Sequence, residues 1–430
     1  GKNAVESLIM VTKPNLRLDF SKAKIFYDLK TLTCKTVFLT LYQTARNVRI
    51  IGLDLQIRYI GEATTHTLYG LYNFGHSLLV DRCNIEIYAE KQINTAALAN
   101  YGGIDTPLDT QADNLSVNDS RIKIHIQPKE SLLPCEVYGI HNYFANSIQI
   151  SDTYIEVRNC GNGSDQCAVG LYNNGRFCRF SNNNVKANGG HNTGVSLEQA
   201  HACGMIDEGM YSLISNSNLV GEWGGSCIGL LLKGEYAKVN GCKILSTHPI
   251  KGTTVRIEGH KIILSDNILT STSRNARIIY TVGSAVTICG NILEVLMNPD
   301  ICKSGVGVMM VNCSDNQFRN IKNCGIYSKQ SRANIHNYCQ LEKIEDSFGN
   351  SISISFNTNQ TIASVQDGAE RYAYFHYNGA SATASDPLLS SISYAESQRS
   401  VEFEYTNKRL TKIKYKDGTF STYTYGETGS

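Results

Sequence analysis

The chain of 430 residues carries 40 Lys and Arg against 38 Asp and Glu, a formal net charge of +2, so charge alone draws it neither to nucleic acid nor to an anionic membrane. Only 18% of the residues are charged, while 36 glycines and many Asn, Ser and Thr punctuate short apolar runs, which is typical of a turn-rich all-β protein. The chain exceeds a usual single domain, but a solenoid escapes that limit because its core grows along one axis.

The first 45 residues predict strands that enter and cap a repeat structure. Residues 16–29, LRLDFSKAKIFYDL, alternate apolar and polar side chains well enough for two strands. The first clear repeat unit is residues 46–59, RNVRIIGLDLQIRY, and a second follows at residues 69–89. Residues 90–137 then break the pattern with a long polar run, which indicates an insertion.

The repeat is clearest over residues 170–297, where short apolar runs close on a small or polar residue, often Asn. The closing residue lies thirteen or fourteen positions after the residue that opens the unit, as Asn184 lies after Gly170. Alternating apolar positions and frequent Gly, Asn and Ser favour short strands over helices. We therefore predict that residues 46–345 form a parallel β-solenoid, in which each coil buries its inward side chains against the next coil.

An inward Asn at the same corner of successive coils can form hydrogen bonds along the stack, which satisfies amides that burial would otherwise leave unpaired. The residues predicted to lie near one corner are Asn84, Asn184, Asn218, Asn267 and Asn291. An antiparallel sandwich with coincidental spacing is the alternative architecture.

Residues 346–430 differ in character and predict a separate β-rich module that serves in trimerisation or in carbohydrate binding. Tyr, Phe, Thr and Ser alternate there, and Asp417-Gly418 is a hairpin-turn sequence. A tail of this length is more than a cap for an open solenoid end, so we expect it to help hold a homotrimer.

Fourteen cysteines are spread through the chain, but no pair has CxxC spacing and no His cluster accompanies them. Reduced, buried cysteines of a protein made in a reducing cytosol fit this pattern better than disulfides or a metal site, and no cofactor is expected. The apolar run at residues 278–297 matches the repeat, so it predicts two buried strands and not a membrane span. The chain starts with Gly1 and not with Met, which suggests a fragment or a processed chain.

The coil units, the cap-like opening and the aromatic C-terminal module together resemble the right-handed, single-stranded parallel β-helix of the pectate lyase-like superfamily, and within it the tailspike depolymerases of bacteriophages. The resemblance covers residues 20–345. The apolar run followed by Gly-Ala-Lys-Gly-Asp-Gly that usually opens such enzymes is missing, and so is a head-binding domain.

This resemblance implies a homotrimer of the virion tail that binds and cleaves bacterial surface polysaccharide, either capsule or O-antigen. It also implies synthesis in the bacterial cytoplasm and attachment to the tail or baseplate through an N-terminal part that this chain lacks. Neither a nucleic acid partner nor insertion into a membrane is expected.

Cleavage of a glycosidic bond by hydrolysis needs two carboxylates near that bond. Four positions after the residues that open three successive units (Gly194, Gly229 and Thr254) lie Glu198, Lys233 and Glu258. We expect these three to stack on one face, with Glu198 and Glu258 about 9–10 Å apart, near the upper end for an inverting pair. Glu235 is expected to point the same way as Lys233. The alternative is an outward Glu-Lys-Glu ladder of ion pairs without catalysis.

The coil from Gly194 to Asn218 is ten positions too long. Its extra segment, residues 200–211, is predicted to bulge from the solenoid, so that Asp207 and Glu208 overhang the carboxylate face. Solvated loop acids are the alternative interpretation.

A second cluster is predicted in the turns that precede each unit, which should stack along one edge. Its members are Asp165, His191, Glu222 with Trp223, His248, Arg274 and Asp300. Trp223 is the only tryptophan and offers a flat apolar face and an N–H donor to a sugar, unless it folds back against its coil.

The resulting hypothesis is polysaccharide cleavage by paired carboxylates, with Trp223 as a stacking wall. A lyase is the second choice and would need a base such as Lys233 or His191 together with neutralisation of a uronate carboxyl group. A non-catalytic adhesin that uses the same groove is the alternative from another functional class.

Overall fold

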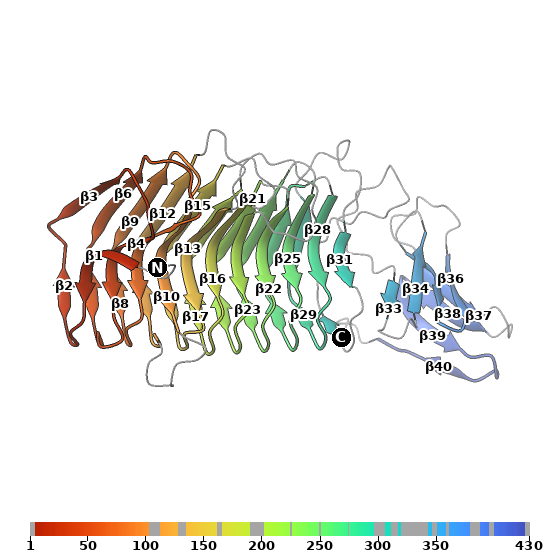
Figure 1. Ribbon diagram of the computed structural model, residues 1–430. Helices are drawn as coiled ribbons and strands as arrows, with labels where there is room; N and C mark the ends of the chain where they lie inside the picture. The colour runs from red at the N-terminus through yellow and green to blue at the C-terminus, as the bar shows by residue number, and fades with distance from the viewer. Residues whose placement is uncertain are drawn as a thin grey trace. The chain divides into compact units, whose positions relative to one another are not determined.

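The computed structural model is all-β, and it forms three stacked parallel sheets followed by one antiparallel sheet (Figure 1). Residues 1–309 with 314–339 form one compact unit, and residues 310–313 with 340–430 form the other. The parts of the chain that the structure describes contain no helix long and apolar enough to cross a membrane. The described residues are 5–102, 112–127, 135–160, 166–189, 202–223, 226–248, 251–273, 275–295, 306–310, 317–319, 343–345, 351–357, 361–378, 388–394 and 400–425.

Each coil of the first unit contributes one strand to sheet A, one to sheet B and one to sheet C, and pairs in parallel with the next coil. The strands of sheet A, in their order across the sheet, are β1 (Val5–Val11), β4 (Lys35–Leu41), β7 (Thr67–Asn73), β10 (Asn94–Tyr101), β13 (Cys135–Tyr143), β16 (Gln166–Asn173), β19 (Ala202–Asp207), β22 (Cys227–Leu232), β25 (Lys251–Ile257), β28 (Asn275–Thr281) and β31 (Val306–Met310).

Sheet B is built from three-residue strands: β2 (Arg17–Asp19), β5 (Arg49–Ile51), β8 (Leu79–Asp81), β11 (Ser116–Asn118), β14 (Gln149–Ser151), β17 (Arg179–Ser181), β20 (Leu213–Ser215), β23 (Lys238–Asn240), β26 (Ile263–Ser265), β29 (Thr287–Cys289) and β32 (Gln317–Arg319). Sheet C contains β3 (Lys24–Leu29), β6 (Asp54–Tyr59), β9 (Asn84–Ala89), β12 (Arg121–Ile126), β15 (Tyr154–Asn159), β18 (Asn184–Asn188), β21 (Asn218–Glu222), β24 (Lys243–Thr247), β27 (Ile268–Ser271) and β30 (Ile292–Val295). The predicted fold class, an all-β parallel β-helix with a C-terminal β-rich module, is confirmed.

The coils begin earlier than predicted and continue through the region predicted as an insertion. β1 and β3 already pair with the following coil, at Val5↔Lys35 and Lys24↔Asp54. Within residues 90–137, strands β10, β11 and β12 each pair in parallel with both neighbouring coils. The small residues of β10 hid this coil, because the run TAALAN lacks the large β-branched side chains that usually mark a strand.

The core is a stack of inward apolar side chains in register. In sheet C, Ile85, Ile122 and Ile155 follow one another along the axis, and each is at most 1% exposed. Full burial of such a side chain stabilises the folded state by about 2–3 kcal/mol. Cysteines contribute to the same core, and all ten that the structure describes are free, six of them buried.

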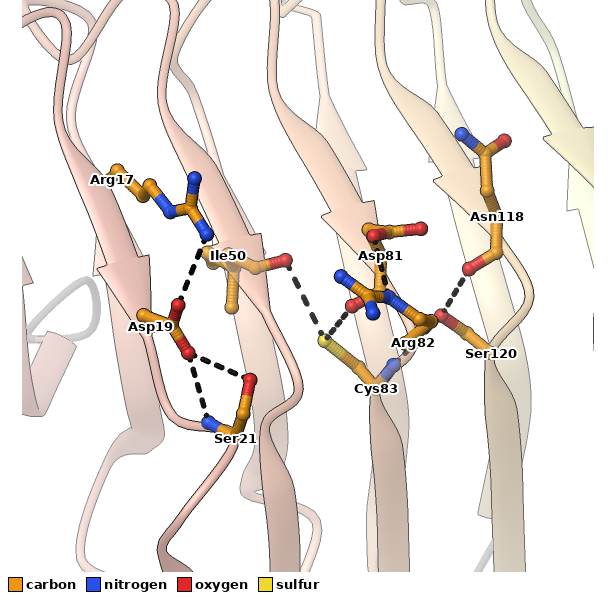
Figure 2. Close-up of polar contacts among 9 residues, drawn as sticks. All are labelled: Arg17, Asp19, Ser21, Ile50, Asp81, Arg82, Cys83, Asn118 and Ser120. Atoms are coloured by element: carbon orange, nitrogen blue, oxygen red, sulfur yellow. Dashed lines mark hydrogen bonds and ion pairs between the residues drawn. The ribbon is translucent and has the colours of Figure 1, made fainter.

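The corner between sheets B and C explains the Asn-rich repeat. Its first turn residue has a left-handed backbone, as in Arg82, Asn182 and Asp266, a conformation that favours Asn, Asp and Gly. The next residue points inward and bonds to the neighbouring coil. Figure 2 shows this corner in successive coils, where the Cys83 N–H donates to Ser120 Oγ over 3.1 Å. The Asn267 N–H donates to Asn291 Oδ1 in the same way, over 3.0 Å.

The five asparagines predicted at one corner do lie at this corner, but in two adjacent columns. Asn267 and Asn291 are the inward residues and are at most 1% exposed. Asn84, Asn184 and Asn218 come one position later, as the first residues of their sheet C strands, and point outward. The Asn218 amide donates to Asn184 Oδ1 over 3.1 Å, so this outer column also bonds along the axis, although not inside the core.

A second, wholly buried ladder runs along the end of sheet A. Each side-chain amide donates to the Oδ1 of the next coil at 2.6–2.8 Å, in the order Asn73, Asn100, Asn142, Asn173 and Asp207. All five are 0% exposed. The last member is an acid. The inward position of the following coil is Leu232, so the ladder stops there.

Asp207 is therefore a buried carboxyl group. Its Oδ1 accepts from Asn173, from Ser212 Oγ at 3.0 Å and from the Gly209 N–H at 3.3 Å, while its Oδ2 has no partner. Burial raises the pKa of Asp207 to about 6, against the lowering effect of the three donors. Asp207 lies on β19, inside the β-helix, so the predictions that it sits in a bulge and that it acts in catalysis on an outer surface are both wrong.

The second unit is one eight-stranded antiparallel sheet. Its strands are β33 (Lys343–Glu345), β34 (Ser351–Phe356), β35 (Ile362–Gln366), β36 (Tyr372–Asn378), β37 (Leu388–Tyr394), β38 (Ser400–Thr406), β39 (Arg409–Lys414) and β40 (Phe420–Thr422). The predicted Asp417-Gly418 hairpin turn is confirmed: it joins β39 to β40, with Gly418 at φ +85°.

We predict that Asp207→Asn stabilises the protein, and more so at high pH. The folded pKa of Asp207 lies above the unfolded value of 3.8, so the wild type loses stability as pH rises through about 6, by about 3 kcal/mol in full. The variant carries no charge to bury, and its amide can donate to the Gly209 carbonyl as Asn73 donates to Gly75. Urea unfolding at pH 4 and pH 8 measures the difference.

Asp119→Asn is the matched control, because Asp119 is exposed and has a left-handed φ of 45° that Asn also adopts. A gain from Asp207→Asn that is equal at both pH values, or a loss at pH 8, would contradict the assignment.

Candidate functional site

The outer face of sheet A carries the acidic residues, once the coils are aligned as the structure has them. Gly204, and not Gly194, occupies the same position as Gly170 and Gly229. A Cβ added at Gly170 would lie 2.6 Å from the Gly204 carbonyl oxygen, and one added at Gly204 would lie 2.6 Å from that of Gly229. The residue four positions after Gly204 is Glu208.

This register corrects the predicted row of acids. Asp207 pairs with Leu232, and Leu232 with Ile257, so Glu208, Lys233 and Glu258 occupy one outward row on consecutive coils. Glu208 takes the place expected for Glu198, which lies outside the described residues. The ten extra residues of this coil fall between the end of β18 at Asn188 and the start of β19 at Ala202, and not in the segment predicted to bulge.

The acids of this row are held by specific donors. Glu208 accepts from the Tyr172 hydroxyl at 2.7 Å and from Lys233 Nζ at 2.9 Å. Glu258 instead pairs with Arg256 at 2.6 Å. Because no described contact joins Lys233 to Glu258, the row is not a continuous Glu-Lys-Glu ladder. The side chains of Glu208 and Glu258 are 27% and 26% exposed, so solvent reaches both.

Towards the N-terminus, the same row becomes aromatic. Phe74, Tyr101 and Tyr143 occupy it on consecutive coils, with ring centroids 6.0 Å and 5.0 Å apart. Tyr101 is 39% exposed. The part of this row from Phe74 to Glu258, here called the sheet A strip, consists of Phe74, Tyr101, Tyr143, Asn174, Glu208, Lys233 and Glu258.

His141 lies beside the strip and is surrounded by tyrosine rings. Its ring stacks on Tyr138 at 4.3 Å and meets the edges of Tyr143 and Tyr172 at 5.9 Å and 4.9 Å. Burial lowers the pKa of His141 to about 4, so the imidazole is neutral at physiological pH. Burial also raises the pKa of the Tyr172 hydroxyl, which therefore stays protonated and donates to Glu208.

The outer face of sheet A is only partly open to solvent. Near the start of the strands several outward residues are fully buried, as Val37, Ala96 and Cys203 show at 0% exposure. Tyr69, Tyr138 and Arg277, which lie in the same row, are partly exposed. At the strand ends the Lys233 side chain reaches 41% exposure, so a ligand from solvent can contact both the strip and these residues.

Glu235 does not follow Lys233 along a strand. β22 ends at Leu232, and Glu235 lies in the following turn, where it forms an isolated bridge with Met210. The alternation of side chains along a strand, on which the prediction depended, no longer applies there.

The turn cluster is not brought to the strip. Glu222 ends β21 on sheet C and pairs with Lys186 at 2.8 Å. Trp223 follows it with φ 56°, and its backbone N–H donates to the Thr247 carbonyl. Both lie where sheet C turns into sheet A, whereas the strip lies at the far end of the six-residue strand β22, roughly 20 Å away. Trp223 is therefore not a wall beside Glu208 and Glu258.

His248 follows β24 at the same corner and is 7% exposed. The remaining turn candidates lie outside the described residues: Asp165, His191, Arg274 and Asp300. Among the residues described, no group of three or more His, Cys, Asp or Glu is arranged to hold a metal ion.

Sequence reasoning missed His141, Tyr172, Arg256 and Tyr280, all on the outer face of sheet A. The signal was present: His141, Tyr172 and Arg256 each lie two positions after the residue that opens the coil (Gly139, Gly170 or Thr254), and side chains two apart on a strand share a face. The residues four positions after each opening residue form the strip, which was predicted, whereas the residues two positions after it form the neighbouring row, which was not.

No protein-family model matches this sequence, and no curated protein matches it. The solved structures to which the chain is similar include phage tailspikes and an alginate epimerase. ORF18 of Geobacillus virus E2 is 11% identical, with TM-score 0.35 over 91% of this chain and 78% of its own. The Dettilon tailspike protein is 11% identical, with TM-score 0.33 over 93% and 74%. The periplasmic alginate epimerase AlgG is 8% identical, with TM-score 0.32 over 67% and 76%. Likenesses of this size carry no argument about what this chain does.

Proposed function

We propose that this chain is a phage tailspike that binds a bacterial surface polysaccharide, capsule or O-antigen, along the sheet A strip and hydrolyses it there. The observation that carries the proposal is the strip itself, a solvent-reached row of aromatic rings that continues into two carboxylates. Ring edges and faces such as those of Tyr101 and Tyr143 suit the apolar C–H surfaces of sugars, while their hydroxyls bond to sugar oxygens.

In this proposal Glu208 and Glu258 form the hydrolytic pair. They are two coils apart, which sets their strands about 9–10 Å apart, and a small lean of the side chains brings the carboxyls into the range of about 6.5–9.5 Å that leaves room for a water. Tyr172 and Lys233 both donate to Glu208 and so orient its oxygens as acceptors, which suits the base that activates water. Glu258 is the acid in this proposal: once substrate binding separates it from Arg256 it takes up a proton, which it then gives to the leaving oxygen.

The C-terminal sheet supports the proposal that the chain assembles as a homotrimer. One face of that sheet is apolar, and its side chains pair across neighbouring strands, as in Ile354↔Val365, Phe375↔Ile392 and Phe403↔Ile413. No described residue of this unit is fully buried. A single sheet must cover its apolar face with a second layer, and two further copies of this chain would supply it.

The location proposed for this trimer is the tail of the virion, after synthesis in the bacterial cytoplasm, with attachment through an N-terminal part beyond this chain. The ten free cysteines are compatible with folding in a reducing compartment. No nucleic acid partner is proposed, because a net formal charge of only +2 gives no general attraction to nucleic acid.

We predict that Glu208→Gln and Glu258→Gln each lower the release of reducing ends from the cognate polysaccharide about a hundredfold or more, because the amide keeps the shape and loses the proton chemistry. A screen of purified capsule and O-antigen types identifies that polysaccharide. Glu235→Gln is the matched control, because Glu235 lies in the turn two residues after Lys233 and outside the strip. Parental rates in both strip variants would refute the assignment.

The same assay separates the alternative functions. Cleavage that creates unsaturated uronates, seen as ultraviolet absorbance, identifies a lyase. Binding without any new chain ends, in the wild type as well as in the variants, identifies an adhesin.

We also predict that the intact chain is a trimer in solution at micromolar concentration, and that Phe375→Glu or Phe403→Glu dissociates it. A charge placed on the apolar face of the sheet must be desolvated when the face is covered. His376→Glu is the control on the opposite face, where the ring bonds to Ser393 over 2.8 Å. Light scattering measures the mass, and a monomeric wild type would contradict the proposal.

A further inference from the structure

We infer that the polysaccharide is acidic and that Arg256 and Arg277 hold one of its anionic groups beside Tyr280, one coil beyond Glu258. The inference rests on the function proposed above and adds the substrate class. Tyr280 and Arg277 lie on β28, and Arg256 faces Tyr280 from β25 in register. All three are on the outer face of sheet A and are partly exposed.

The two arginines converge on one ring. The guanidinium of Arg256 lies 5.5 Å from the Tyr280 centroid, and that of Arg277 lies 5.3 Å from it. Attraction between a cation and the ring holds each of them, but it does not neutralise either one. Two positive charges gathered at one side chain repel each other, so this arrangement is most stable with an anion between them.

The charges of this region leave one cation unpaired. Lys233 is paired with Glu208, and Arg256 with Glu258. Arg277 has no carboxylate within salt-bridge distance among the described residues. Its guanidinium instead makes a cation–π contact with Tyr280. The five side chains Glu208, Lys233, Arg256, Glu258 and Arg277 therefore carry a net charge of +1 together.

Arg256 also has a donor without an acceptor. Its Nε is buried and has no hydrogen-bond partner, although its terminal nitrogen bonds to Glu258. Buried donors in native proteins are paired in nearly all cases, so a shift of this guanidinium that lets it bond to an acceptor is favoured. A guanidinium presents its nitrogens as a fork that matches the two oxygens of a carboxylate or a phosphate.

A sugar chain that follows the sheet A strip reaches this pair after it passes Glu258. Its anionic group, a uronate carboxylate or a phosphate of the repeat, would bond to Arg277 and, after a shift of its side chain, to the guanidinium of Arg256, while the ring of Tyr280 contacts the sugar. Because Arg256 lies on the coil of Glu258 and Arg277 lies on the next coil, the pair fixes where the chain sits relative to the bond that is cut.

Chemical analysis of the polysaccharide that the protein binds is the first test. We expect a uronate or a phosphate in its repeating unit, and the analysis identifies which. If the protein binds or cuts only neutral polysaccharides, this inference fails while the proposed function stands. If it binds no surface polysaccharide, both fail.

Arg277→Gln is the second test, with the identified polysaccharide as the probe. We expect KM to rise about tenfold or more with little change in kcat, because the lost contact lies one coil away from the reacting bond. The salt dependence of KM should weaken in the variant, and Arg277→Lys should restore part of the affinity.

Arg179→Gln is the matched control, because Arg179 is an exposed arginine on sheet B, away from the strip. For a uronate polymer, reduction of its carboxylates to alcohols should raise the KM of the wild type towards that of Arg277→Gln and leave the variant unchanged. Equal KM values and equal salt dependence for wild type and Arg277→Gln on the acidic polymer would overturn the assignment.

Discussion

Every polar side chain that points into this β-helix must find its partner in the neighbouring coil, because water does not reach the core and the coils touch only along the axis. The Asn ladder at the end of sheet A meets this constraint by donating in one direction, from Asn73 towards Asp207. Along the ladder, each inner member accepts one bond from the preceding coil and donates one to the following coil. The last member needs only to accept, and a carboxylate is an acceptor without donors.

The direction in which the Asn ladder donates explains why its last member, buried in the core, is an acid. With Leu232 as the next inward residue, an amide at the end of the ladder would have to turn back to its own coil for an acceptor, whereas the carboxylate leaves only a lone oxygen without a donor. The cost appears as a raised pKa. Asp207 is thus explained by the architecture, although its type and its neighbour Glu208 had suggested a catalytic residue.

The limits of the sequence are visible in the run Asn182-Asn183-Asn184. The pattern correctly indicated a corner, but three adjacent asparagines serve three different needs there. Asn182 adopts φ 56°, Asn183 points inward at 3% exposure, and Asn184 begins a sheet C strand on the outside. Each need favours the same residue type, so composition cannot tell which of the three belongs to the core.

The candidate site shows a related limit. Two glycines, Gly194 and Gly204, were available to open one coil, and Gly204 lies fourteen positions before Asn218, the same distance as Gly170 before Asn184. Choosing the first of them put Glu198 where the structure has Glu208. Pairing between strands decides such a choice, because a glycine of the inward column must admit the carbonyl of the next coil, and that contact involves residues far apart in the chain.

The inward and outward faces of sheet A therefore carry different information. The inward face is fixed by packing and by the polar ladders, so it repeats, and its repetition is what the sequence reveals. The outward side chains at the strand ends have no such obligation and change from coil to coil: they are aromatic at the ends of β7 to β13 and ionised at the ends of β19 to β25. Because neighbouring coils present different chemistry at a fixed spacing of about 4.8 Å, a long polymer lying across them meets binding groups and reacting groups in a set order.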